Sequence, residues 1–172
     1  MLGVFDGFPK SVHKIAFFTC SIANKRLQLL VTTALHKLNK NESNPHAMMD
    51  KETSQFTTIY EVGIADGSDF NYLDDEETKR LTKTINKKPF QMMDFLLLLR
   101  HYRIDRDRKV PLKFDYYMLR LTFDQGSVEI KVFHEKGPMR FPPQEIIDII
   151  VDETNHTFSK RILAPLDTLD RF

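Results

Sequence analysis

A chain of 172 residues is long enough to bury one hydrophobic core, and its 41% hydrophobic and 28% charged residues are typical of a globular protein rather than a disordered one. The 25 basic and 24 acidic side chains leave a formal net charge of +1, which argues against a protein that attracts polyanions through its overall charge but allows a local basic patch. Cys20 has no second cysteine to pair with, so no intramolecular disulfide can form, which fits a reducing compartment.

The location expected from the sequence is the cytoplasm. The first residues, MLGVFDGFPKSVHK, lack the basic, apolar and small-residue regions of a signal peptide in their required order. The longest apolar runs, residues 15–18 and 95–99, are far shorter than the roughly 20 residues that a membrane span needs. We therefore expect a soluble protein without a membrane partner.

The first predicted elements are a strand over residues 12–22 and a helix over residues 23–40. The strand is rich in aromatic and β-branched residues. In the helix, apolar residues recur at the i, i+3, i+4 spacing that forms one buried stripe: Leu27, Leu30, Val31, Ala34, Leu35 and Leu38. Residues 41–54 are polar and include Pro45, so we expect a mobile loop there.

A second strand and a second helix follow. Residues 55–64 predict a strand with alternate residues from Phe56 to Ile64 on one face, and the Asp-Gly-Ser-Asp sequence within residues 65–72 predicts a turn. Four consecutive acidic residues, Asp74 to Glu77, complement the positive end of a helix that runs through about residue 86.

Residues 90–103 allow two interpretations. Their Phe, Met and Leu content favours a helix by propensity, whereas their position before two evident strands favours a strand in a meander. We expect a strand from about Phe95 onward, because tertiary context often overrides propensity in short apolar runs.

A hairpin is predicted over residues 114–123 and 128–134, joined by a four-residue loop at residues 124–127. This loop pairs Phe123 with Val128, Leu121 with Ile130 and Leu119 with Val132 on one apolar face. The other face carries Met118, Arg120, Thr122, Glu129, Lys131 and Phe133, so it is expected to meet water or a partner.

The last predicted helix begins at residues 141–143, where proline suits the first turn, and continues to about residue 153. Residues 157–172 are assigned to a C-terminal tail. Together the elements predict one α+β domain over residues 1–172: a mainly antiparallel sheet of about five strands, ending in a meander, with about three helices on one face.

Candidate catalytic motifs are weak. Glu129-Ile-Lys131 with the upstream Asp115 resembles the acidic-x-Lys signature of a metal-dependent nuclease, in which two carboxylates hold one cation. The predicted hairpin places Asp115 seven residues from the position opposite Glu129, and on the other face of the strand. A Glu–Lys pair on a solvent-facing strand is therefore the favoured interpretation, and a nuclease-like hydrolase is the alternative.

No cofactor, metal site or catalytic residue is predicted. The six histidines do not occur at HxH or HxxxH spacing, and the sequence has no GxSxG, GxGxxG or Walker A motif. Cys20 alternates with Phe18 and Ile22 in the first strand, which favours a structural cysteine over a nucleophile. An enzyme is thus less favoured than a binding protein, without being excluded.

The strongest local signal is a basic segment at residues 100–113, in which six basic and two acidic side chains leave a charge of +4. Arginines among exposed rings suit nucleic acid, because guanidinium groups contact phosphates while rings stack on unpaired bases. An acidic protein partner is also consistent, as is a solvated hairpin whose Asp and Arg side chains pair with one another. The predicted binding residues are Arg100, Arg103, Arg106, Arg108, Lys109, Lys113, Tyr116, Arg120, Lys131 and Phe133.

The leading functional hypothesis is therefore a non-catalytic binding module that contacts nucleic acid or an acidic partner through this segment and the adjacent polar sheet face. A metal-dependent nuclease-like hydrolase centred on Glu129 and Lys131 is the first alternative. A structural subunit of a homo-oligomer is the second.

Overall fold

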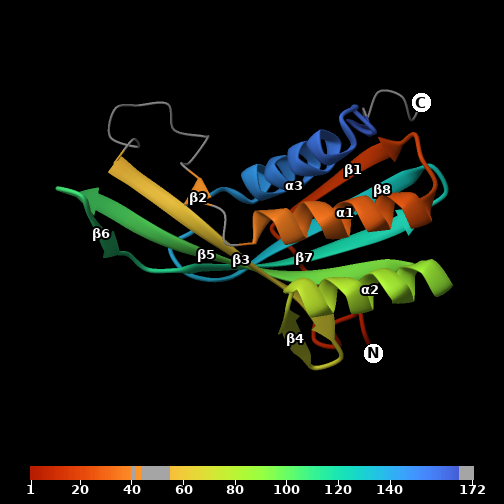
Figure 1. The fold of residues 1–172 in the computed structure, drawn as a ribbon, viewed down its shortest axis with the longest axis horizontal. Coiled ribbons are helices and arrows are strands. Elements are labelled where there is room, and N and C mark those ends of the chain that lie inside the picture. Colours follow the sequence, from red (N-terminus) through yellow and green to blue (C-terminus); the bar gives the residue numbers. More distant parts are fainter. Residues whose placement is uncertain (40–41, 44–54, 167–172) are drawn as a thin grey trace.

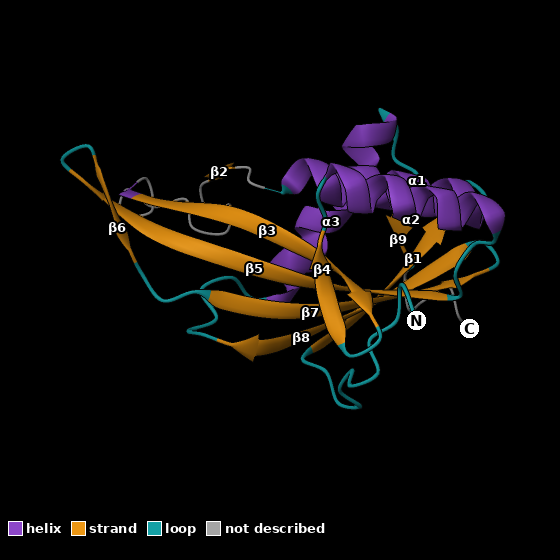
Figure 2. Ribbon diagram, turned by 60° about the horizontal axis from the view of Figure 1, so that its bottom comes forward, coloured by secondary structure: helices purple, strands orange, loops and turns teal. Residues whose placement is uncertain are grey.

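A computed structural model describes residues 1–39, 42–43 and 55–166, and these residues form one antiparallel sheet covered by helices on one face (Figures 1 and 2). In this part of the chain nine strands take the order β2-β3-β5-β7-β8-β1-β9, with β4 paired to β3 and β6 paired to β5. The strands are β1 Lys14–Cys20, β2 Glu42–Ser43, β3 Phe56–Asp66, β4 Asp69–Tyr72, β5 Met92–Asp105, β6 Arg108–Pro111, β7 Asp115–Asp124, β8 Ser127–Lys136 and β9 Leu163–Pro165. The helices are α1 Asn24–Leu38, α2 Asp75–Lys87 and α3 Pro143–Phe158.

The predicted fold class is confirmed, but the expected number of strands is wrong. The five strands expected from the sequence correspond to β1, β3, β5, β7 and β8. The other four strands are two to four residues long and lie at edges or hairpin ends, where so few residues show no alternation of apolar and polar side chains.

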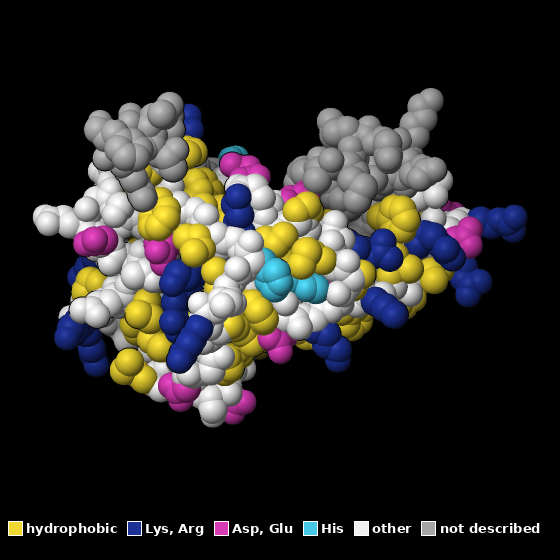
Figure 3. Space-filling view, turned by 180° about the vertical axis from the view of Figure 1, so that it is seen from behind, with side chains coloured by type: hydrophobic (Ala, Val, Ile, Leu, Met, Phe, Trp, Pro, Cys, Tyr) yellow, Lys and Arg dark blue, Asp and Glu magenta, His cyan; other side chains and the backbone are white. Residues whose placement is uncertain are grey.

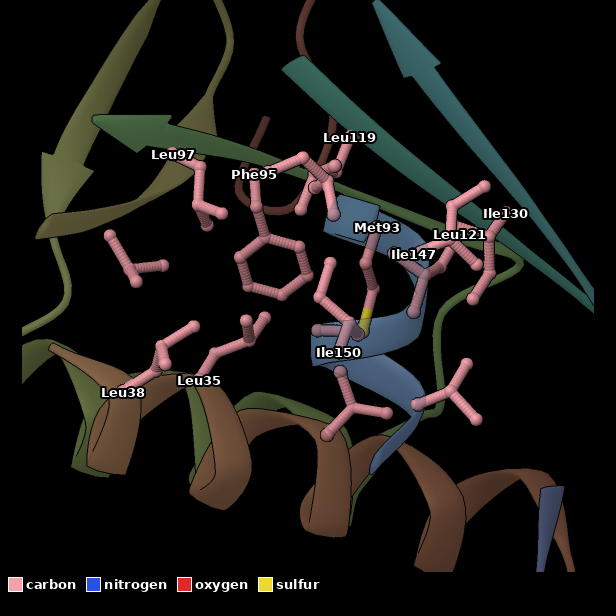
Figure 4. Packing of buried hydrophobic residues seen from close by; sticks show 14 of the residues in the cluster. Leu35, Leu38, Met93, Phe95, Leu97, Leu119, Leu121, Ile130, Ile147 and Ile150 are labelled. Carbon is pink, nitrogen blue, oxygen red and sulfur yellow. The ribbon is translucent and has the colours of Figure 1, made fainter. Parts of the chain in front are cut away.

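The ambiguous residues 90–103 contain a strand, as expected. This strand, β5, begins at Met92, before the expected start at about Phe95. β5 lies between β3, which pairs with its residues 97–103, and β7, which pairs with its residues 92–99. Met93, Phe95, Leu97 and Leu99 all point toward the helices and are fully buried. Figure 4 shows Met93, Phe95 and Leu97 packed with Leu119 and Leu121 of β7 against side chains of α1 and α3. Burial in a central strand thus outweighs the helical propensity of these side chains.

The predicted hairpin register is confirmed. Phe123 pairs with Val128, Leu121 with Ile130 and Leu119 with Val132. The loop is shorter than expected, because Asp124 also pairs with Ser127, and Gly126 takes a positive φ of 75° in the turn. A register shift between Tyr116 and Tyr117 bends the other end of the hairpin and brings Lys136 opposite Tyr116.

The helices begin where the sequence predicts. The Asp74 side chain caps α2 by accepting a hydrogen bond from the Glu77 amide at 2.9 Å, and Pro143 occupies the first turn of α3. α3 is longer than expected, since it continues to Phe158 and ends at Ser159 with a left-handed φ of 62°. No helix in the described ranges is both long and apolar enough to cross a membrane.

Two segments assigned to loops lie partly outside the described residues. Of residues 41–54, the structure describes Glu42–Ser43, which pair with β3. Of the tail at residues 157–172, it describes the end of α3 and β9, which pairs with β1. The remaining residues of both segments lie outside the described part.

The N-terminal residues 2–8 cross the sheet face that carries no helix (Figure 2). The carboxylate of the fully buried Asp94 accepts a hydrogen bond from the Phe5 amide at 2.7 Å and two from Arg120, also at 2.7 Å. The Arg120 guanidinium in turn lies 4.2 Å from the centroid of the Phe8 ring. This buried ion pair fastens the N-terminal segment to β5 and β7.

Candidate functional site

Most of the basic segment forms an exposed hairpin, residues 103–113, which we call the basic hairpin. It comprises the end of β5, the turn at Arg106 and Asp107, and β6, and it extends beyond the helices at one end of the sheet (Figure 1). Arg103, Arg106, Arg108, Lys109 and Lys113 are all exposed. Seen from behind, Lys and Arg side chains gather at this end of the molecule (Figure 3).

The charges of the basic hairpin are largely unmatched within the described ranges. The pairing of Asp105 and Asp107 with neighbouring arginines, expected for a solvated loop, is not found among the described residues. Arg103, Arg106, Arg108 and Lys113 likewise have no ion pair there. An exposed cation that no carboxylate neutralises keeps its full charge for an incoming anion.

The turn of the basic hairpin is built without glycine. Arg106 and Asp107 take φ values of 46° and 67°, a conformation that two-residue hairpin turns require and that Asn-Gly usually supplies. A positive φ has a free-energy cost for a residue other than glycine. Arg106 and Asp107 are therefore less favourable for the stability of this turn than glycine would be.

Beside the basic hairpin lies a hollow of about 600 Å³, which we call the Phe114 hollow. It is lined by Lys113, Phe114, Tyr116, Lys136, Gly137 and Pro138. Tyr116 of β7 lies opposite Lys136 of β8, so the hollow lies across the ends of these two neighbouring strands. Two of its lining residues, Lys113 and Tyr116, belong to the predicted binding set.

Arg100 connects the basic hairpin to the Phe114 hollow. Its guanidinium donates a hydrogen bond to Glu61 on β3 at 3.2 Å and lies over the Phe114 ring, 5.4 Å from the ring centroid. Of the residues predicted to bind, Lys113 and Tyr116 therefore line the hollow with Phe114, and Arg100 lies over the Phe114 ring. Arg100 differs from the hairpin arginines because its charge is already paired.

Under the hollow, Asp115 organises a buried polar cluster. Its carboxylate is fully buried and lies 2.8 Å from Nε2 of both His101 and His134. It also accepts hydrogen bonds from the amides of Met139 and Arg140, at 2.7 and 3.0 Å. Four donors thus meet one carboxylate, which satisfies a charge that would otherwise be costly to bury.

The cluster also fixes the rim of the hollow. Gly137 takes a φ of 112°, and a Cβ there would collide with the Phe114 carbonyl oxygen and approach Asp115 Oδ1 to 2.5 Å. A side chain at this position is therefore excluded by both conformation and space. Because the Met139 and Arg140 amides bind the same carboxylate, residues 137–140 are held against β7.

Hydrogen bonding and burial set the protonation of the cluster. Burial alone would raise the pKa of Asp115, but hydrogen bonds from His134, from the Arg140 and Met139 amides and from His101 outweigh it and lower the pKa below its usual 3.8. Burial lowers the pKa of His101 below its usual 6.5, against the opposite effect of Asp115. Neutral His101 then donates from Nε2 to Asp115 and accepts the Thr58 hydroxyl at Nδ1, at 2.9 Å.

The remaining predicted residues lie elsewhere on the helix-free face and are engaged by other groups. Arg120 is held by Asp94 and covered by the N-terminal segment. Lys131 lies 3.5 Å from Glu129, the pair that the sequence favoured, and the Phe133 ring packs against His13 at 5.0 Å between centroids. The structure does not bring these three residues to the Phe114 hollow.

Sequence reasoning missed four residues that line the hollow and the histidines beneath it. Lys136 lies opposite Tyr116 because of the register shift, and no sequence pattern predicts that shift. Phe114, Gly137 and Pro138 lie just outside the strands, and Gly137 within Lys136-Gly-Pro138 was the one available sign of a tight backbone approach. His101 and His134 come from two different strands, so no short spacing links them.

The residues of the nuclease alternative lie apart in the structure. Asp115 faces the helices and binds His101 and His134, whereas Glu129 faces the other side of the sheet and pairs with Lys131. Within the described part of the chain, no group of three or more His, Cys, Asp or Glu side chains is arranged to hold a metal ion. Cys20 is half-buried at the end of β1, and burial raises the pKa of its thiol.

Two further hollows lie on the described surface, and their lining residues differ from those of the Phe114 hollow. One of about 520 Å³ lies between the end of α3 and β9, and its lining mixes acidic and basic side chains, among them Asp148, Asp152, Lys160 and Arg161. The other, of about 420 Å³, lies along α2 and is lined by Glu76 and four cations, Lys79, Arg80, Lys83 and Lys87, of which Arg80 is bonded to Glu77 and Asp66. The Phe114 hollow differs because its two lysines lie beside two aromatic rings.

Comparison with known proteins gave no match: no family model matches the chain, and no curated protein or solved structure is significantly similar to it. Its function is therefore inferred from the chemistry of its own residues.

Proposed function

We propose that the chain is a non-catalytic nucleic-acid-binding module that contacts the phosphate backbone with the basic hairpin and the adjoining Phe114 hollow. The observation that carries the proposal is a group of exposed cations without carboxylate partners in the described ranges, Arg103, Arg106, Arg108 and Lys113, next to a hollow lined by two rings and two lysines. Unpaired cations and accessible rings are the two features that binding to nucleic acid requires.

The charge distribution supports this proposal better than overall charge does. The whole chain carries +1, whereas residues 100–113 carry +4, so positive charge is concentrated at this end of the sheet. The other basic run, residues 79–88, borders a hollow along α2 whose lining includes Glu76 and no aromatic ring, so it does not offer the same combination of cations and rings. An acidic peptide would match the same cations, but it would make no use of the rings in the hollow.

The test is a salt series with labelled single-stranded and double-stranded RNA and DNA, read by fluorescence anisotropy. The logarithm of the binding constant should fall linearly with the logarithm of the salt concentration. The slope of this line reports the number of phosphate contacts. Arg103→Glu with Arg106→Glu should lower the affinity on the order of 100-fold at about 0.1 M salt and reduce the slope by about two.

The matched control is Lys79→Glu with Lys83→Glu, which makes the same change in net charge on the exposed face of α2. This control should change the affinity by about threefold at most, because surface charges beyond the Debye length are screened. Equal loss in both variants would show a diffuse charge effect and contradict an interface at the basic hairpin.

Three other results would overturn the proposal. Absence of binding to every nucleic acid at low salt would remove it, and capture of poly-glutamate in place of nucleic acid would point to an acidic protein partner. Cleavage that appears only with magnesium and is lost in Glu129→Ala would establish the hydrolase alternative.

A further inference from the structure

We propose that the Phe114 hollow receives one unpaired nucleotide, so that the module selects single-stranded over double-stranded nucleic acid. The base would stack on the rings of the hollow while its flanking phosphates lie at Lys113 and Lys136. This inference rests on the proposed function, and it adds the class of nucleic acid that the site accepts.

The size of the hollow suits a single nucleotide. At about 600 Å³ it falls within the range of sites that enclose small molecules, roughly 300–1,000 Å³. A duplex presents its bases stacked and paired, so none can enter such a hollow without being unpaired at a cost. A single strand meets no such cost, because its bases are already accessible.

The rings and the guanidinium beside them form a stacking surface. Phe114 and Tyr116 lie on either side of the inward-pointing Asp115 and therefore share the helix-free side of β7. Arg100 lies over the Phe114 ring and is itself fixed by Glu61. Unpaired bases stack on aromatic rings and on guanidinium planes alike, and each stacked base contributes favourably whatever its identity.

Two lysines bracket these rings. Lys113 precedes Phe114 along the chain, and Lys136 lies opposite Tyr116 across β7 and β8. Both are exposed, and neither has an ion pair within the described part of the chain. Their position suits the two phosphates that flank one nucleotide, since a cation then stands on each side of the stacked base.

Buried contacts fix the shape of the hollow. Asp115 lies between its two rings in the sequence and binds the amides of Met139 and Arg140, while Gly137 packs directly against the Phe114 carbonyl. A site held by buried hydrogen bonds loses little conformational entropy when it binds, which favours affinity. The buried cluster thus positions the stacking surface without touching the nucleotide.

The experiment compares oligonucleotides of one length and sequence in single-stranded and double-stranded form, with 2-aminopurine as the probe base. The wild-type chain should bind the single strand more tightly and quench the 2-aminopurine fluorescence through stacking. Phe114→Leu and Tyr116→Leu keep apolar side chains but remove the rings, so each should weaken single-strand binding roughly tenfold and leave duplex binding unchanged.

The matched control is Phe133→Leu, which removes a ring from the same sheet face outside the hollow and should leave both affinities unchanged. The wild-type quenching measurement needs no substitution and so does not depend on whether a variant folds. Equal affinity of the wild type for both forms without quenching, or equal losses for both forms in the ring variants, would overturn this inference. The proposed function would still stand in those cases, since it fails only if no nucleic acid binds through the basic hairpin.

Discussion

The two sides of the sheet near the start of β7 differ in whether their charged groups are paired. On the side that faces the helices, Asp115 is fully buried and every donor around it is satisfied by hydrogen bonds to its carboxylate. On the other side, Lys113 and Lys136 are exposed beside two rings without an ion pair in the described ranges. Matched charge inside stabilises one conformation, whereas unmatched charge outside stabilises nothing by itself and becomes useful only when a partner supplies the anion.

The comparison implies that substitutions on the two sides should have separable effects. Changes to the buried cluster should alter the free energy of unfolding, and changes to the basic hairpin should alter binding with little effect on folding. Three predictions test the effects on the free energy of unfolding, from the largest to the smallest.

Asp115→Asn should have the largest effect. The amide has one acceptor oxygen and presents its NH₂ to groups that are themselves donors, so at least two of the four hydrogen bonds are lost in a buried site. We expect a loss of about 3 kcal/mol in the free energy of unfolding, measured by urea denaturation.

The control for this substitution is Asp152→Asn, at an exposed position on α3, which should change the free energy by less than about 0.5 kcal/mol. If Asp115→Asn were as well tolerated as the control, the buried cluster would not be the stabilising element described above. The Phe114 hollow would then need another explanation for its fixed rim.

The pH dependence of stability should be the next largest effect. Since the pKa of His101 is lower in the folded chain than its usual 6.5, the unfolded chain binds the proton first. The contribution of His101 to the free energy of unfolding is therefore complete above pH 6.5, and it is lost as the pH falls below 6.5. Asp115, whose pKa also lies below its usual value, adds a further loss below about pH 3.8.

Urea denaturation at a series of pH values measures these losses. His101→Gln should be less stable at pH 8 and should lose stability less steeply between pH 6.5 and 5 than the wild type does, because it has no imidazole to protonate. An unchanged slope in this variant would assign the loss to other groups and leave His101 outside the charge balance of the cluster.

The turn of the basic hairpin should give the smallest effect. Asp107→Gly should raise the free energy of unfolding by about 0.5 kcal/mol, because Asp107 holds a left-handed φ of 67° that glycine adopts without steric cost. Asp105→Gly removes the same charge from the extended end of β5 and should lower the free energy instead. Equal effects of the two substitutions in thermal melts would show that the turn carries no conformational cost.

The long elements could be predicted from the sequence because each has its own periodicity. Alternation from Leu119 to Phe123 and from Val128 to Val132 specified the hairpin register, and the apolar stripe specified α1. The short strands β2, β4, β6 and β9 could not be predicted, since two to four residues carry no period and their pairing depends on strands already in place.

The candidate site was predictable only in its charge. The basic residues Arg100 to Lys113 are visible as a local excess, but Lys136 joins them through a register shift, and the cluster beneath them joins residues of β5, β7 and β8. Conversely, Arg120 was expected to face a partner, yet it binds Asp94 under the N-terminal segment. Contacts between residues so distant in the sequence leave no local pattern from which to infer them.

The position of β1 in the sheet has a consequence for how the chain folds during synthesis. β1 lies between β8 and β9, with Lys14 opposite Val132 and Cys20 opposite Leu163, so its described neighbours in the sheet all come from the last third of the chain. While the ribosome is still translating, this aromatic-rich strand has no partner and is exposed to chaperones or to self-association. We therefore expect folding to be slow, with closure of the sheet around β1 as its final step after β8 and β9 have been synthesised.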